Sequence, residues 1–350
     1  MAGFCFGFEK ESETSDFASS ITNQLEHERS VTQGSETPTS LQIFEPNCEL
    51  ISDLPSMEYD NVPINGNATQ APSDTEEKLY PTINMKRVRV LENRHLFHHS
   101  AAYNSDLIPG VYEGGLKTWE CSIDLCNYLY NQYRADTNDL TTALDSNGIT
   151  LELGCGHGLP GILVSRLGSA NGSKVVFSDY NDFVLEIATW PNLLLNTPDV
   201  NRSSLLLRVT LLSGDWMQLS EDLVGGSDCR IPGTPSDGRF NLILAAETTY
   251  TEASARDTAT LLSRHLKFDS GIGLVATKRY YFVVGGGSDS FRSFAEKIRV
   301  ERIVSKSQAR LYSLQVETVK VYDSGIGIIR EVLRVKLVDS EERENDRLDE

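Results

Sequence analysis

The residues whose types and spacing indicate chemistry lie in the middle of the chain, behind a glycine-rich turn. Residues 149–161 read I-T-L-E-L-G-C-G-H-G-L-P-G, a short apolar run that leads directly into the turn. Gly154, Gly156 and Gly158 remove side chains where the backbone turns tightly, so that a ligand can approach it closely. Such a turn between a strand and a helix is typical of a site for a nucleotide-type ligand, although glycine turns also serve plain strand-to-helix connections.

Carboxylates follow each of the next three apolar runs. Asp179 comes 23 residues after Gly156, close to the spacing at which a second strand delivers a carboxylate to ribose hydroxyls. Asp215 and Trp216 follow the next run, where they could accept from an adenine amino group and cover its ring. Glu247 follows the last of the three. The alternative for each carboxylate is the capping of a helix, which Asp often does at a strand-to-helix junction.

These side chains need an open α/β sheet to bring them together. Five short apolar runs are expected to be its strands, at residues 149–153, 174–178, 205–212, 240–246 and 271–277. Pro160 suits the first position of the helix after the glycine turn, and Gly168 is expected to end that helix. Because open sheets of this kind bind ligands outside the carboxyl ends of their strands, the carboxylates are expected to meet at one edge.

The last third of the chain separates two ligand classes, dinucleotides and S-adenosylmethionine. After a helical stretch at residues 291–298, two long alternating runs at 310–321 and 326–338 predict an antiparallel hairpin. A nicotinamide enzyme would instead carry its turn in the first unit of a six-stranded parallel array. The layout, with the E-x-G-x-G-x-G turn, resembles the class I methyltransferase fold, a seven-stranded, mostly parallel sheet with an antiparallel C-terminal hairpin that binds S-adenosyl-L-methionine.

A narrower resemblance rests on blocks that follow one another in a fixed order between residues 80 and 338. They are residues 112–125, the E-L-G-C-G-H-G turn, and residues 178–181, 190–192, 213–216, 247–250 and 277–287. Together these blocks resemble the histidine protein methyltransferase family. The Lys-x-Trp-Glu motif at 117–120 and the Tyr-Phe-x-x-Gly-Gly-Gly motif at 281–287 are the narrower signals, whereas the glycine turn and Glu-x-x-Tyr are shared with many protein methyltransferases.

The resemblance implies a reaction, a cofactor and a set of site residues. The reaction is transfer of a methyl group from S-adenosyl-L-methionine to a histidine of a large-subunit ribosomal protein of the L-three family, at the tele nitrogen, the one farther from the backbone. The implied cofactor contacts are Trp119, Glu120, Glu152, Gly154, Gly156, Gly158, Asp179, Tyr180, Asn181, Gly214, Asp215, Trp216 and Glu247.

The chemistry of a histidine acceptor is compatible with this implication. An imidazole with a pKa of about 6.5 is mostly neutral at cellular pH, so one ring nitrogen already carries a nucleophilic lone pair. The enzyme's work is then mainly to align that lone pair with the methyl group and to exclude water. Glu247 is the candidate that holds the proton of the other ring nitrogen, and Tyr250 is expected to line the substrate mouth. Alternatively, Glu247 orders its own loop or contacts the cofactor.

Two other functions stay open at this stage. A methyltransferase for protein lysine or for a small molecule would use the same fold, and the Glu-x-x-Tyr and Lys-x-Trp-Glu motifs resemble lysine-directed relatives too. The second open function is that of an assembly factor, which binds a ribosomal protein and has catalysis only as a secondary property.

Two neighbouring features receive structural rather than chemical interpretations. His157 is expected to be a turn position that points away from the methyl group. The triple glycine at residues 285–287 is expected to form a flexible lip over the active site.

Charge is distributed unevenly and predicts the domain organisation. The chain of 350 residues has a net charge of −18; residues 1–85 contribute −12 and residues 339–350 contribute −5, which leaves −1 for residues 86–338. Residues 1–80 are therefore expected to be a disordered acidic extension and 339–350 a disordered acidic tail. Between them, residues 81–338 are expected to form the methyltransferase domain, as an N-terminal segment (81–148) and a Rossmann-like core (149–338).

The same distribution of charge indicates the kind of partner. A nearly neutral core with acidic flanks is poorly suited to nucleic acid, whose binding depends on Lys and Arg meeting phosphates. It suits a basic protein, such as a ribosomal protein, which acidic tails could attract through long-range steering. A single domain with disordered tails predicts a monomer.

Targeting signals and metal-binding patterns are not found in the sequence. Neither a signal peptide nor a membrane-spanning run is recognised, although Phe4, Phe6 and Phe8 interrupt the polar N-terminus. Six cysteines form no Cys-x-x-Cys pair, so neither zinc nor a disulfide framework is predicted. His95, His98 and His99 have no further ligand at metal-site spacing. The expected location is the cytoplasm and the nucleus.

Overall fold

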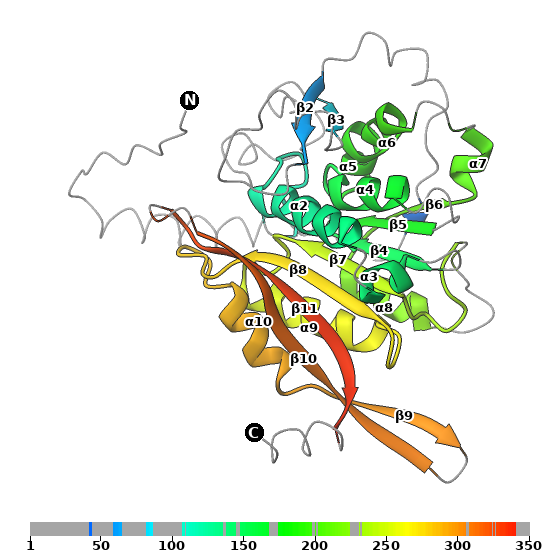
Figure 1. Ribbon diagram of the computed structural model, residues 1–350, viewed down its shortest axis with the longest axis vertical. Coiled ribbons are helices and arrows are strands. Elements are labelled where there is room, and N and C mark those ends of the chain that lie inside the picture. Colours follow the sequence, from blue (N-terminus) through cyan, green and yellow to red (C-terminus); the bar gives the residue numbers. More distant parts are fainter. Residues whose placement is uncertain are drawn as a thin grey trace, which may run out of the picture. The chain divides into compact units, whose positions relative to one another are not determined.

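A sheet of nine strands forms the centre of the part of the chain that the computed structural model describes (Figure 1). That part comprises residues 42–43, 59–64, 82–86, 107–108, 110–135, 138–144, 148–167, 174–197, 200, 202–224, 231, 233–305, 308–323, 325 and 327–340. The strands lie in the order β1 (Gln42–Ile43), β6 (Val209–Ser213), β5 (Lys174–Asp179), β4 (Ile149–Leu153), β7 (Leu242–Ala246), β8 (Ile272–Lys278), β11 (Arg330–Asp339), β10 (Gln308–Tyr322) and β9 (Arg299–Ser305).

The strand order confirms the predicted class I methyltransferase fold. Strands β6, β5, β4, β7 and β8 are parallel neighbours, and β11 enters antiparallel to β8 with β10 antiparallel to β11. The seven strands from β6 to β10 thus form a mostly parallel sheet with an antiparallel C-terminal hairpin. Two further strands lie at its edges, β1 beside β6 and β9 beside β10.

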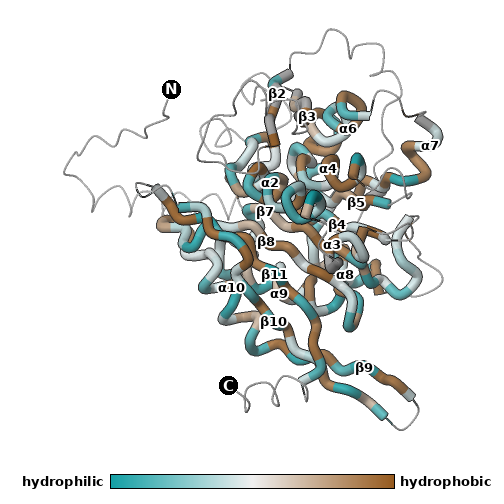
Figure 2. The backbone as a smooth tube through the Cα atoms, viewed as in Figure 1, coloured by the Kyte–Doolittle hydropathy of each residue, from teal (hydrophilic) through white to brown (hydrophobic). Residues whose placement is uncertain are grey.

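Successive residues of the central strands pack into two separate hydrophobic cores, one on each face of the sheet. Phe177 belongs to one core and Val176 to the other, as a side-chain period of two requires. A strand that is covered on both faces reads as a nearly continuous apolar run, as β7 does with the sequence L-I-L-A-A. Figure 2 shows mostly apolar residues along the neighbouring β8. The sheet therefore lies between two helical layers.

The helices divide between these faces. One face packs against α2 (Glu120–Arg134), α3 (Asn138–Ala143), α4 (Leu159–Leu167) and α6 (Trp190–Asn196). The other packs against α8 (Trp216–Val224), α9 (Glu252–His265) and α10 (Ser288–Ala295). Two short segments, α5 (Asp182–Val184) and the π-helical η4 (Leu185–Thr189), lead without interruption into α6. Helix α4 begins and ends close to the predicted positions.

A small antiparallel hairpin lies N-terminal to the main domain. Strand β2 (Tyr59–Pro63) pairs with β3 (Thr82–Lys86), and Val62, Ile64 and Ile83 are buried in the same hydrophobic core as residues of α2, α4 and α6, two of which (α4 and α6) contact β3. Strands β1 and β2 fall within residues 1–80, for which the composition predicts no fold, so that expectation is wrong at these strands. The few apolar residues of this polar segment, such as Val62 and Ile64, are buried in the core of the domain, and their burial stabilises strand β2 there. Phe4, Phe6, Phe8, the histidines at 95, 98 and 99 and residues 341–350 lie outside the described residues.

The predicted third strand is wrong in its first half. Residues Arg202–Leu206 form helix α7, and β6 begins only at Val209. Leu205 is buried, whereas Leu207 between the two elements is 76% exposed. A single apolar run contained the end of a helix and the start of a strand, which hydrophobicity alone cannot separate.

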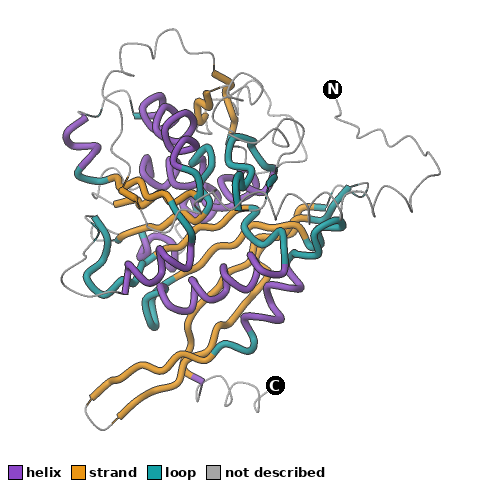
Figure 3. Tube along the Cα trace, turned by 180° about the vertical axis from the view of Figure 1, so that it is seen from behind, coloured by secondary structure: helices purple, strands orange, loops and turns teal. Residues whose placement is uncertain are grey.

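The end of the predicted helical stretch at 291–298 is also shifted. Helix α10 ends at Ala295, and residues Arg299–Ser305 form the unpredicted edge strand β9. Seen from behind in Figure 3, the hairpin of β9 and the first half of β10 extends past the helices. A search of the described residues finds no helix that is long and apolar enough to cross a membrane.

Candidate active site

The glycine turn after β4 has a backbone conformation that favours glycine. Gly154, Gly156 and Gly158 have φ angles of +58°, +52° and +72°. A Cβ atom at Gly156 would lie 2.9 Å from the carbonyl oxygen of Gly115, in residues 110–119, which we call the covering loop. Glycine at 156 is therefore needed both for the left-handed backbone and for the close approach of the covering loop.

Asp179 at the end of β5 is bound to this turn. Its Oδ2 accepts a hydrogen bond from the Gly156 N–H at 2.8 Å, and its Oδ1 accepts one from the Asn181 N–H at 3.2 Å. Burial raises the pKa of Asp179 to about 6, although these backbone donors stabilise the charged form. The side chain is where the sequence predicts it, next to the turn, and contact with ribose stays a prediction.

Glu152, predicted as a cofactor contact, joins two elements in the structure, and its contact with a cofactor stays a prediction. Its Oε2 accepts a hydrogen bond of 2.9 Å from the N–H of Gly161 in the first turn of α4. The residue is buried, and burial raises the pKa of its carboxyl group to about 8. Glu152 therefore links β4 to α4 inside the protein.

Tyr180 and Asn181, also predicted as cofactor contacts, hold the covering loop. The Tyr180 hydroxyl donates to the carbonyl of Gly110 at 3.0 Å. The Asn181 side chain donates to the carbonyl of Val111 at 2.9 Å and accepts from the Glu113 N–H at 3.3 Å. Because sequence spacing shows only that they follow β5, it could not reveal that their partners lie about 70 residues earlier in the chain.

Tyr250, in the segment that follows β7, also contacts the covering loop. Its hydroxyl donates to the carboxylate of Glu113, and burial together with that negative charge raises the pKa of Tyr250 well above its usual value. Tyr250 thus helps to position the covering loop, and its place at a substrate mouth stays a prediction. Glu113 was missed by the sequence analysis, although it lies within the motif at residues 112–125.

At the end of β6, Asp215 is a helix cap. Its Oδ1 accepts hydrogen bonds from the N–H groups of Met217 at 2.7 Å and Gln218 at 3.2 Å, at the start of α8. The capping alternative is therefore correct for this residue. Its side chain is nevertheless exposed, and within the described part of the chain Oδ2 has no hydrogen-bond partner, so an adenine contact is still open to it.

Trp216 and Gly214 complete this side of the site. Gly214 donates its N–H to the carbonyl of Asp179 at 3.0 Å, which joins the ends of β5 and β6. Cζ2 of Trp216 would lie 3.3 Å from a Cβ atom at Gly154, so the indole lies against the glycine turn. Its buried Nε1 has no hydrogen-bond partner among the described residues.

Glu247 lies across the turn from these groups, because β7 borders β4 on the side opposite to β5 and β6. It has a φ angle of +58°, which is uncommon for a residue other than glycine and marks a position held by its surroundings. Its buried Oε2 accepts a hydrogen bond from the Tyr281 hydroxyl. Oε1 lies 3.5 Å from Nζ of Lys278 as an ion pair and has no hydrogen bond of regular geometry among the described residues. The buried Cys121 thiol adjoins the same carboxylate, and burial together with the charge of Glu247 raises the pKa of that thiol well above its usual value.

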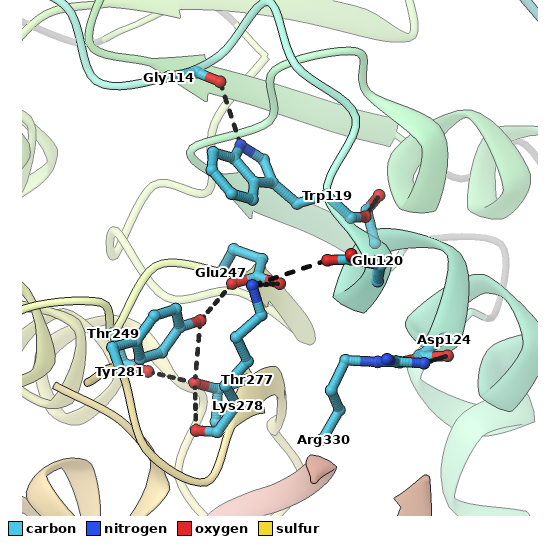
Figure 4. A network of polar contacts seen from close by, with 11 residues as sticks. Gly114, Trp119, Glu120, Asp124, Glu247, Thr249, Thr277, Lys278, Tyr281 and Arg330 are labelled. Carbon is cyan, nitrogen blue, oxygen red and sulfur yellow. Dashed lines mark hydrogen bonds and ion pairs between the residues drawn. The ribbon is translucent and has the colours of Figure 1, made fainter. Parts of the chain in front are cut away.

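Trp119 and Glu120 reach Glu247 through Lys278. Trp119 donates its Nε1–H to the carbonyl of Gly114 at 3.1 Å, and Glu120 Oε2 lies 3.6 Å from Lys278 Nζ. Figure 4 shows the lysine between the two glutamates with the indole above it. Burial opposes the charge of Glu120, but its backbone hydrogen bond and the charge of Lys278 keep its pKa below the usual value. Lys278 and Tyr281 lie in a recognised motif, but their role was not predicted.

The triple glycine does not form the lip that was predicted. Gly286 and Gly287 donate their N–H groups to the carbonyls of Tyr250 at 3.1 Å and Thr249 at 2.8 Å, and a Cβ atom at Gly286 would overlap the backbone of Tyr250. Glycine is required because two loops meet backbone to backbone. The exposed segment is the preceding one, in which Phe282 and Val283 are 77% and 96% exposed. We call residues 280–284 the apolar rim.

His157 is a buried residue of the turn, and the described residues offer no candidate metal centre. His157 is 6% exposed, and burial lowers the pKa of its ring to about 4, so it is neutral at pH 7. Its carbonyl accepts from the side chain of Asn192 at 2.9 Å. Among the described residues, no group of three His, Cys, Asp or Glu side chains could hold a metal ion.

The arrangement fits S-adenosylmethionine as a ligand across the strand ends. Asp215 and Trp216 could hold adenine, and Asp179 is placed beside them for ribose. The other end of such a ligand would then lie towards β7, where Glu247 presents a buried carboxylate oxygen without a hydrogen bond. Buried acceptors without partners are costly in a protein unless a ligand or water satisfies them.

The known proteins that this chain resembles in sequence are named as methyltransferases. A family model described as "Lysine methyltransferase" matches residues 110–298. Histidine protein methyltransferase 1 homolog of Dictyostelium discoideum is 37% identical, over 66% of this chain and 60% of its own length. The protein of the same name from Mus musculus is 32% identical, over 65% of this chain and 61% of its own. The chain thus spans about 60% of the length of these curated relatives.

Solved structures are much more distant. The precorrin-6y C5,15-methyltransferase of Geobacter metallireducens GS-15 is 13% identical, over 55% of this chain and 81% of that chain, with a TM-score of 0.31. The strand order, rather than this likeness, identifies the fold.

Replacement of Asp215 can separate its two roles. Asp215→Asn keeps the Oδ1 acceptor that caps α8 but replaces Oδ2 with a donor, which would oppose an adenine amino group. We expect its affinity for S-adenosylmethionine to fall roughly tenfold, the effect of about 1.4 kcal/mol, with little change in melting temperature. Asp215→Ala should also lose about 1 kcal/mol of stability. Calorimetric titration and chemical denaturation measure both effects.

Asp222→Asn, on the same helix, is the matched control and should bind the cofactor as the wild type does. Wild-type affinity in Asp215→Asn would show that this carboxylate is a cap and nothing more.

Proposed function

The chain belongs to the methyltransferase family whose model is described as lysine methyltransferase, and we propose that it transfers a methyl group from S-adenosylmethionine to a histidine side chain of a protein. The observation that carries the choice of histidine is the 29–37% identity to relatives named histidine protein methyltransferase 1. The geometry at Glu247 supports it, because a buried carboxylate oxygen without a hydrogen bond suits a neutral imidazole N–H.

In this proposal Glu247 orients the acceptor. When bound, the cofactor supplies an electrophilic methyl group on a sulfonium. The lone pair of one ring nitrogen forms the new bond to the methyl carbon, the carbon–sulfur bond breaks, and the ring becomes cationic until its second nitrogen releases a proton. Oε1 of Glu247 holds the N–H of that second nitrogen, while Tyr281 fixes Oε2. If the held nitrogen is the one nearer the backbone, the methyl group goes to the tele nitrogen.

The apolar rim supports a protein as the acceptor. Residues 280, 282, 283 and 284 are large apolar side chains exposed by 40% to 96%, beside the loop that carries Glu247. Tyr281 anchors the rim, since its hydroxyl bonds to Glu247 and its backbone bonds to Gly285 and Gly286. Exposed apolar surface next to a reaction centre is typical of a site that binds a protein segment around the reacting residue.

We further propose that the substrate is a basic protein, a ribosomal protein of the L-three family, methylated by a monomeric enzyme in the cytoplasm and nucleus. The acidic flanks of a nearly neutral core support attraction of a basic partner rather than of nucleic acid. Lysine methylation is the second candidate, because the family model carries that description.

The product amino acid distinguishes the two candidates. We expect the purified chain, incubated with S-adenosylmethionine labelled in the methyl group and a protein extract, to yield labelled tele-methylhistidine after hydrolysis. The purified ribosomal protein should be labelled in the same assay, and its His→Ala variants would locate the acceptor. Labelled methyllysine in place of methylhistidine would contradict the proposal.

Glu247→Gln tests the orienting role. The amide keeps the shape of the side chain but can turn a donor towards the imidazole N–H, so the wrong tautomer is no longer excluded. We expect kcat to fall roughly 100-fold, the size of effect that misalignment of reacting atoms produces, while the affinity for S-adenosylmethionine, for which Asp179 and Asp215 are the main proposed contacts, falls much less. A wild-type rate would remove Glu247 from the mechanism.

Substitution in the apolar rim tests protein binding. Phe282→Ser combined with Val283→Ser should raise KM for the protein substrate roughly tenfold, because loss of buried apolar contact costs on the order of 1–3 kcal/mol. The affinity for S-adenosylmethionine should not change. Leu207→Ser, at a residue that is 76% exposed at the opposite ends of the strands, is the control. An unchanged KM in the double variant would place the substrate elsewhere.

A further inference from the structure

Lys278 occupies an unusual position for a lysine of an enzyme's own chain. Its Nζ lies 3.5 Å from Glu247 and 3.6 Å from Glu120, and its side chain is only 13% exposed. Nζ is also 5.3 Å from the ring centre of Trp119 and 5.4 Å from that of Tyr281. Two carboxylates and two aromatic rings, from residues 119–120, Glu247 and Tyr281, therefore surround one ammonium group (Figure 4).

Aromatic rings and carboxylates are also the groups with which proteins bind the alkylammonium group of another molecule. Aromatic faces attract cations through the ring quadrupole, and carboxylates add charge-assisted contacts. Lys278 is the last residue of β8, and β8 borders β7 in parallel, so its ammonium reaches the same edge of the sheet as Glu247. An acceptor lysine that approached Glu247 would need the place that Lys278 already fills.

We propose that Lys278 sets the acceptor specificity of this site, admitting a neutral imidazole and rejecting a cationic lysine side chain. This inference rests on the proposed function and deepens it, since it names the feature that separates histidine from lysine within one fold. Two effects act together. The ammonium of Lys278 repels a second ammonium, and its ion pair with Glu247 engages the negative charge that would otherwise attract one.

A neutral imidazole escapes both effects. It brings no charge into the site, and its N–H needs only one acceptor, which Oε1 of Glu247 offers without a hydrogen bond among the described residues. A lysine, by contrast, must also lose a proton before it can attack, and a site that holds a fixed positive charge does not favour binding of its ammonium form. Lys278 thus acts through Glu247 and is a positioning residue.

The test compares the products of four enzymes in the same assay. Wild type, Lys278→Met, Lys278→Arg and Lys117→Met are each incubated with methyl-labelled S-adenosylmethionine and protein extract, and methylhistidine and methyllysine are separated after hydrolysis. We expect only methylhistidine from the wild type, and a ratio of methylhistidine to methyllysine at least tenfold lower from Lys278→Met. Lys278→Arg keeps the charge and should restore the wild-type ratio.

Lys117→Met is the matched control. Lys117 lies 4.5 Å from the ring centre of the same Trp119, so the variant removes a nearby positive charge without altering the pair with Glu247. It should leave the ratio unchanged. A change as large as that of Lys278→Met would show that charge near Trp119, rather than Lys278, sets the specificity.

A binding measurement covers the case in which Lys278→Met is inactive. Titration with n-butylammonium, in the presence of S-adenosylhomocysteine, should show at least tenfold tighter binding to Lys278→Met than to the wild type. Equal affinity, or methylhistidine alone from an active Lys278→Met, would overturn the inference. Methyllysine as the product of the wild type would instead overturn the proposed function, so the two failures are distinct.

Discussion

A hydrogen bond of 2.8 Å from the Gly156 N–H to the buried carboxylate of Asp179 joins the two strand ends on which the site is built. A carboxylate away from water is costly unless donors satisfy it, and here the backbone N–H groups of Gly156 and Asn181 do so. With β5 fixed against the turn, Tyr180 and Asn181 can hold the covering loop. The ends of β4 and β5 thereby position the segment that precedes α2.

The covering loop and the start of α2 connect the β4–β5 side of the site with the β7–β8 side. The covering loop ends at Trp119, immediately before Glu120 opens helix α2, and both residues meet Lys278 from β8. On the far side, Glu247 and Tyr281 join the ends of β7 and β8. The reaction centre is therefore assembled from rigid strand ends and from loops bonded to them, which is the support that alignment of reacting atoms demands.

The family description and the names of the relatives differ in the acceptor, lysine or histidine, and the structure suggests why one fold can serve both. In the proposed function, the glycine turn, Asp179 and Asp215 serve the cofactor, which both reactions share. The proposed basis of acceptor choice is the set of charged groups around Glu247, where Lys278 is the residue that would distinguish the two acceptors. A cofactor-binding fold that is common to the family is thus compatible with different acceptor side chains.

The sequence alone predicted the turn at residues 154–158, four of the five parallel strands and the C-terminal hairpin. Glycine positions and apolar runs indicate the local backbone conformation and the burial of side chains directly. Strand ends also placed Asp179, Asp215 and Glu247 at one edge. The sequence did not predict which atoms the carboxylates bind, because the hydrogen-bond partners of Glu152 and Asp215 depend on the direction of each side chain. The meeting of Lys278 and Glu247 with Glu120 depended on tertiary packing, because Glu120 lies more than 100 positions before both residues and becomes their neighbour only when β7 and β8 pack against α2.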